Sequence, residues 1–190
     1  MFKLNLENMV ENLKKVRVKF TKGLTEEEVA RIELLYGIQF PPDVKELLMF
    51  ALPVSKEFVN WRDESEERIR ERLNWPLEGL LVDVEENGFW MKQWGERPAS
   101  LQQALQIAAE QYQQAPALIP IYSHRYIPST PHRRGNPVFS VYQTDIIYYG
   151  ADLSAYFRAE FGIKKGKEDD QAKEKFIPFW SEIAHLDWEE

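Results

Sequence analysis

Hydrophobic residues at the start of the chain recur with the periods of regular secondary structure. Leu6, Met9, Val10 and Leu13 fall on one helical face, which predicts an amphipathic helix. Residues 16–20 then alternate apolar and basic side chains, a period that favours a half-buried strand, with continuation of the helix as the alternative. We therefore expect a helix that leads into a strand.

A pair of helices is predicted next. Thr25 and Glu28 have the spacing of a capping box, in which each side chain bonds the backbone N–H of the other residue. The helix that they start is expected to end at Gly37, because glycine adopts the left-handed conformation easily. Pro41 and Pro42 preset the first turn of a second helix, so a short link containing proline should join the two.

The middle of the chain combines a charged segment with an apolar one. Residues 64–73 are nearly all charged, with acid–arginine pairs at helical spacing, so we expect a helix on the surface. Residues 75–84 hold an apolar run, which we interpret as a separate short buried element. A turn is indicated at 87–88 (Asn-Gly), and Ser100 with Gln103 forms a second capping box that starts another helix.

The last third changes to strand patterns. Strands are predicted at 118–122, 138–142 and 146–149, and Pro120 favours an edge or strand-end position for the first of them. The second and third form an antiparallel hairpin that is apolar at both parities. We therefore expect this hairpin to be central in a sheet that helices cover. Residues between the first strand and the hairpin are predicted to be a loop.

The end of the chain is predicted to be helical with a charged interruption. Asp152 caps a helix that Gly162 ends. Residues 164–175 form a charged linker, and residues 176–188 resume an apolar pattern that should dock as a final short helix. Together these elements indicate one α+β domain with a mixed, largely antiparallel sheet surrounded by helices.

Composition narrows the class of protein. The chain has 190 residues and no cysteine, which excludes disulfides and thiolate metal sites and fits a reducing compartment. A formal charge of −7 argues against general nucleic-acid binding. No signal-peptide pattern or apolar run of about 20 residues is present, so we expect a cytoplasmic protein without a membrane segment.

Residues able to do chemistry are few. The three histidines, His124, His132 and His185, lie in no metal-ligand spacing, and no nucleophile elbow or phosphate-binding glycine motif is present. The sequence therefore predicts no catalytic residue, no metal site and no cofactor.

One acid-free segment is unusual in this acidic protein. Residues 111–144 contain no Asp or Glu but include Arg125 and two further arginines. The Arg125 guanidinium is expected either to pair with a carboxylate inside the fold, for which Asp145 is favoured, or to recognise a partner. Trp90 and Trp94 have the spacing of one helical turn and are interpreted as core or contact residues.

Three blocks of the sequence resemble the SUKH superfamily, named for cell-wall assembly regulators of the Smi/Knr type. They are GLTEEEVARIELLYGIQFPPDVKELLMF (23–50), EGLLVDVEENGFWMKQWGERP (78–98) and the segment from LIPIYSHRYIPSTP to IIYYGADLSAYFRAEF (118–161). The resemblance divides the chain into an N-terminal helix and edge strand (1–19), a SUKH-like domain (20–161), and a charged linker with a docking helix (162–190).

The resemblance implies a non-catalytic protein-binding module. Bacterial members are thought to be immunity proteins that neutralise a polymorphic toxin, so the implied partner is a toxin domain. The alternative is a ligand-binding or regulatory scaffold domain that uses a groove near Arg125, with Trp90 and Tyr148 in its lining. The candidate binding residues are Trp90, Trp94, His124, Arg125, Tyr126, Asp145 and Tyr148.

Overall fold

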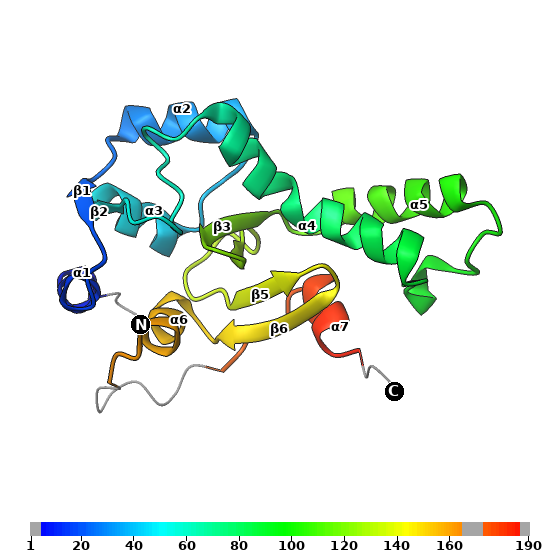
Figure 1. Cartoon of the computed structure of the whole chain (residues 1–190). Helices are drawn as coiled ribbons and strands as arrows, with labels where there is room; N and C mark the ends of the chain where they lie inside the picture. Colours follow the sequence, from blue (N-terminus) through cyan, green and yellow to red (C-terminus); the bar gives the residue numbers. More distant parts are fainter. Residues whose placement is uncertain (1–4, 165–172, 187–190) are drawn as a thin grey trace.

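The computed structural model describes residues 5–164 and 173–186 of the chain. Its elements are α1 (Leu6–Lys15), β1 (Phe20–Lys22), α2 (Glu26–Tyr36), α3 (Pro42–Phe50), β2 (Ala51–Pro53), α4 (Glu66–Glu86), the 3-10 helix η1 (Lys92–Trp94), α5 (Leu101–Gln114), β3 (Leu118–Tyr122), β4 (Arg125–Pro128), β5 (Val138–Tyr142), β6 (Asp145–Gly150), α6 (Leu153–Phe161) and α7 (Trp180–Ala184). The predicted α+β class is confirmed (Figure 1).

The predicted helix ends are confirmed where local chemistry determines them. Thr25 Oγ1 accepts a hydrogen bond from the backbone of Glu28, and the Glu28 carboxylate accepts one from Thr25 N. Gly37 closes α2 with a left-handed φ of 64°. Asp152 caps α6 through Ala155 N at 2.7 Å, so these short polar signals define the helix boundaries.

The strands form two antiparallel sheets. β1 pairs with β2, and the larger sheet has the order β3-β4-β5-β6. Its register sets Arg125 opposite Ser140 and Tyr126 opposite Phe139. Since successive side chains of a strand point to opposite faces, Arg125 and Tyr126 belong to different sides of the sheet.

Each face of the larger sheet is covered by helices, as predicted. One core contains residues of α1, α2, α3 and α6 together with Ile127 and Val138 from the sheet. The other contains residues of α5, α7 and the second half of α4 packed against Tyr126, Phe139 and Val141. The sheet therefore separates two hydrophobic cores.

Helix α4 belongs to both cores, and it corrects the prediction of a separate buried element at 75–84. Ile69 packs into the first core and Leu80 into the second, so one continuous helix crosses from core to core (Figure 1). Pro76 lies inside this helix and cannot donate to the carbonyl of Arg72. The Tyr126 hydroxyl donates to that carbonyl at 2.8 Å instead, which explains why the helix continues through the proline.

Three further predictions about strands are wrong. Residues 16–17 form the turn after α1, with Arg17 at a φ of 71°, and the strand starts only at Phe20. The predicted loop after β3 contains β4, which was missed because Pro128 and the Ser-Thr-Pro run behind it are typical of loops. With β4 in place, the hairpin of β5 and β6 lies at one side of the sheet and β6 is an edge strand, not a central one.

The hairpin is nevertheless well packed. Phe139 and Val141 are fully buried, and β6 contacts both α6 and α7. The final helix docks as predicted, since Trp180 and Ile183 join the second core. Of the predicted linker, 165–172 lie outside the described residues, as do 187–190 at the end of the final apolar segment. No helix in the described part of the chain is long and apolar enough to span a bilayer.

Candidate functional site

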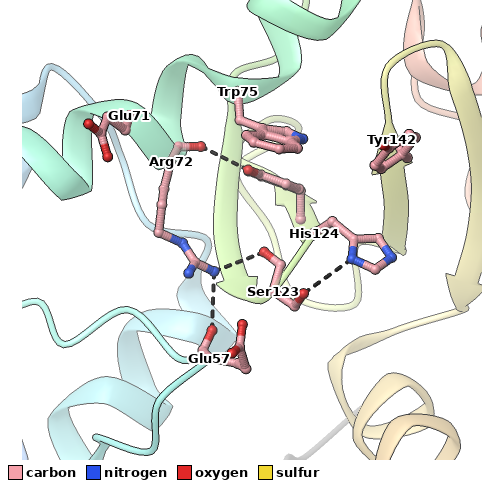
Figure 2. A pocket seen from close by; sticks show the side chains of 8 residues that line it. Glu57, Glu71, Arg72, Trp75, Ser123, His124 and Tyr142 are labelled. Carbon is pink, nitrogen blue, oxygen red and sulfur yellow. Dashed lines mark hydrogen bonds between the residues drawn. The ribbon is translucent and has the colours of Figure 1, made fainter.

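A pocket of about 410 Å³ lies where α4 passes the turn between β3 and β4 (Figure 2). We call it the aromatic pocket, and its lining residues are Glu57, Glu71, Arg72, Trp75, Ser123, His124, Tyr126 and Tyr142. They come from α4, the strands β4 and β5, the β3–β4 turn, and the segment that precedes α4. A volume of this size suits a side chain or a small ligand.

The position of α4 over the sheet defines the pocket. Gly79 lies so close to the β5–β6 turn that a Cβ atom there would be 2.8 Å from Gln143 Cα. Asp83 accepts hydrogen bonds from the backbone N and the hydroxyl of Thr144 at 2.8 and 2.6 Å. These contacts hold Tyr142, at the end of β5, at a fixed distance from the helix.

The inner wall of the pocket is a hydrogen-bonded network. Arg72 Nη2 donates to the carbonyls of Glu57 and Ser123 at 3.1 and 2.8 Å. The Tyr126 hydroxyl donates to the Arg72 carbonyl, and burial raises the pKa of this phenol, so it stays protonated. Figure 2 shows this network joining α4 to the β3–β4 turn. The inner wall is therefore preorganised.

Two aromatic rings face the open side. The exposed fractions of Trp75 and Tyr142 are 46% and 57%, which is high for such large apolar side chains. In Figure 2 the two rings lie on either side of the space above His124. The pocket thus offers aromatic surface to a partner.

The surroundings of His124 favour its neutral form over its charged form. Its Nδ1 lies 3.2 Å from Ser123 Oγ. Burial lowers its pKa from the ordinary value, and the nearby Arg125 charge lowers it further. Within the described hydrogen bonds and ion pairs, no carboxylate orients the ring. The Ser123–His124 contact therefore lacks the third group of a hydrolytic triad.

Two neighbouring hollows extend the pocket along α4. One of about 500 Å³ is lined by Glu66, Glu67, Arg70, Glu71, Asn74 and Glu78, and one of about 300 Å³ by Asp83, Asn87, Phe89, Tyr142, Gln143, Thr144 and Asp145. They share Glu71 and Tyr142, respectively, with the aromatic pocket. We call the three hollows together the acidic surface. Seven carboxylates and two guanidiniums line it.

Both arginines of the acidic surface are engaged within the protein. Arg70 donates to the Glu66 carboxylate at 2.7 Å and to the carbonyl of Leu35. Arg72 is directed at backbone carbonyls, as described above. The exposed charge along α4 is therefore strongly negative, and such a field attracts a basic partner.

The structure brings together only part of the predicted binding set. His124 and Tyr126 line the aromatic pocket, and Asp145 lies in the third hollow. Trp90 and Trp94 lie elsewhere, in a T-shaped contact at 5.2 Å, with Trp94 buried in the second core. Tyr148 donates to Ser181 Oγ of α7.

Arg125 is buried, but the expected pairing with Asp145 is wrong. Arg125 Nε donates to the Glu160 carboxylate of α6 at 2.9 Å, and its Nη1 donates to Ser140 Oγ at 2.8 Å. Its guanidinium also lies 3.9 Å from the centre of the Tyr149 ring. Asp145 is exposed at the start of β6. The register explains the error, because Asp145 pairs with Tyr142 at the end of the hairpin while Arg125 faces Ser140.

The register also separates Arg125 from Trp90 and Tyr148. Tyr148 pairs with Phe139 and belongs to the second core with Trp90, whereas Arg125 points to the opposite face. The predicted groove lined by Trp90, Arg125 and Tyr148 is therefore not formed.

Trp75, Tyr142 and Glu71 are site residues that sequence reasoning missed. Trp75 was interpreted as part of a buried element, although it directly follows a charged helix and lies four residues after Glu71. That spacing puts both on one helical face, which was the available signal. Tyr142 gave no signal of its own, because only the packing of β5 against α4 brings it near.

Neither a metal-binding cluster among the residues that the structure describes nor a similar known protein assigns a function to this chain. No group of three or more His, Cys, Asp or Glu able to hold a metal ion occurs among residues 5–164 and 173–186. A scan of protein-family models finds no match, and searches of curated proteins and of solved structures find none either. Membership of the SUKH superfamily therefore stays a prediction from the sequence motifs.

Proposed function

We propose that this chain is a non-catalytic protein-binding module that acts in the cytoplasm and neutralises a basic toxin domain. The toxin class comes from the SUKH resemblance of the sequence. The observation that carries the proposal is the acidic surface, where seven carboxylates line three adjoining hollows along α4. Such a surface complements a basic face and accelerates encounter with it.

A binding role suits the chemistry of the pocket better than catalysis. A general base needs a positioned proton acceptor near an activated nucleophile. Here Ser123 and His124 are neighbours in a turn, and Arg125 is neutralised by Glu160 on the other side of the sheet. Exposed Trp75 and Tyr142 supply the rigid aromatic anchors that protein interfaces favour.

The test begins with the genomic neighbourhood, because the proposal expects a neighbouring gene to encode a toxic domain. That domain is then coexpressed with this chain in bacterial cells. Cells that produce the toxic domain with the wild-type chain are expected to survive, and cells that produce the toxic domain alone to die. Survival should fall when Trp75 and Tyr142 are both replaced by alanine. Failure of the wild-type chain to protect the cells, with both proteins present in soluble form, would reject the proposal.

A further inference from the structure

The aromatic pocket has features that its place in the acidic surface does not explain. An acidic surface needs only carboxylates in solvent, yet here two large rings are left about half exposed at the mouth of a preformed hollow. Adjacent large apolar side chains are normally buried within the fold unless they form a surface that binds a partner. The pocket therefore indicates a specific occupant.

The lining favours a cation. The faces of Trp and Tyr rings carry negative potential and attract Lys or Arg side chains. Glu57 and Glu71 line the same pocket and add two carboxylates. Burial lowers the pKa of His124, which favours a neutral imidazole in the lining.

The Arg72 charge in the lining does not oppose this occupant. Its Nη2 atom is saturated by the carbonyls of Glu57 and Ser123, which keeps the guanidinium on the inner wall beside the loop. The two carboxylates of the pocket outnumber this single cation. A second cation at the mouth, between Trp75 and Tyr142, would therefore enter a region of net negative charge.

A guanidinium fits the rings better than an ammonium. It is planar, weakly hydrated and able to stack on an aromatic face while its edges donate to carboxylates. The protein uses the same contact twice within its own fold, since Arg125 lies over Tyr149 at 3.9 Å and Arg70 over Tyr36 at 5.2 Å.

We propose that the aromatic pocket takes an arginine side chain of the protein partner, held between the rings of Trp75 and Tyr142 above His124 (Figure 2). This inference rests on the proposed function, because it names the anchor by which the basic partner docks on the acidic surface.

The test uses a blocked arginine, N-acetyl-arginine methylamide, as the probe, and follows the indole N–H resonance of Trp75 by NMR. The matched ligand is N-acetyl-citrulline methylamide, which has the same shape without the charge. We expect a saturable shift of the Trp75 resonance with the arginine probe and binding about tenfold weaker with citrulline.

Variants locate the site. Tyr142→Ala should weaken binding of the arginine probe several-fold, and Glu71→Gln, which removes one negative charge from the lining, should weaken it by a smaller factor. Phe176→Ala, which removes a ring of similar exposure outside the pocket, and Glu110→Gln on α5 should leave it unchanged.

Two results would overturn the inference. Equal binding of arginine and citrulline would show that the pocket selects shape and not charge, and no saturable shift with either would show that it is no side-chain pocket. Both results leave survival in the coexpression assay unaffected. Failure of the proposed function is thus distinguishable, because it would be loss of protection despite intact binding of the arginine probe.

Discussion

Arg125 is enclosed by a carboxylate, a hydroxyl and an aromatic ring, and its side chain is only 10% exposed. A guanidinium in such a place serves the fold, because removing one member of an enclosed pair leaves the other charge uncompensated. From the sequence alone, burial of Arg125 was one of two open alternatives, the other being recognition of a partner by the acid-free segment around it. Its partner could not be inferred, because the sequence favoured Asp145, and only the register shows that Arg125 faces Ser140 while its guanidinium pairs with Glu160.

Replacing Arg125 by alanine should destabilise the protein by roughly 3–5 kcal/mol, because Glu160 would stay enclosed without its cation. Thermal and urea unfolding of the variant measure this. Asp145→Ala is the matched control and should change the free energy of unfolding by less than about 0.5 kcal/mol, since Asp145 is exposed. Similar stability for both variants and the parent would mean that the Glu160 pair contributes nothing.

At the scale of elements, capping signals were predicted well and long-range contacts were not. The boundaries of α2 follow from Thr25, Glu28 and Gly37, which act within one or two turns of the chain. The continuity of α4 was missed because a proline usually interrupts a helix. What compensates for Pro76 is the hydroxyl of Tyr126, which is remote in sequence.

This compensation can be measured by a double-mutant cycle. Tyr126→Phe should lower the free energy of unfolding by about 1–3 kcal/mol, because the Arg72 carbonyl loses its donor. In a Pro76→Ala background, the restored N–H can donate to that carbonyl, so the same substitution should cost clearly less. Equal costs in the two backgrounds would refute the link between the proline and the tyrosine. Tyr142→Phe, at an exposed ring, serves as the control.

An ion pair joins helix α2 to the segment before α4, and its contribution to stability depends on pH. Arg62 donates to both carboxylate oxygens of Glu28, and this bond, followed by that of the Thr25 backbone, lowers the pKa of Glu28 from 4.5 to about 2. Because the folded pKa is depressed, the stabilisation is complete above the ordinary value of 4.5. It is lost as the pH falls towards about 2.

Glu28→Gln should therefore be less stable than the parent at pH 7, and the difference should shrink to near zero at about pH 2, the folded pKa of Glu28. Urea unfolding at several pH values checks this, with Glu26→Gln on the same first helical turn as the control. A difference that stays constant across the acid range would show that Glu28 does not titrate as the ion pair requires.

At the scale of the whole molecule, the sheet separates two cores and α4 spans them. The junction of the two cores lies at Trp75 and Pro76, between Ile69 in one core and Leu80 in the other, and the aromatic pocket opens there. The net charge of −7 was visible in the sequence. Its concentration along α4 was only partly visible, because Glu57 and Asp145 reach the acidic surface through tertiary packing.

The central claim is that this acidic surface binds a basic protein partner. The most direct measurement is calorimetric titration in which the toxic domain that a neighbouring gene is expected to encode is added to the parent and to a Glu67→Gln, Glu71→Gln, Glu78→Gln variant. These exposed carboxylates line the hollow on α4. The control variant removes the same charge elsewhere, through Glu7→Gln, Glu11→Gln and Glu110→Gln. We predict binding weakened about tenfold for the α4 variant and unchanged for the control. Equal affinities for all three proteins, or equal losses in both variants, would contradict the claim.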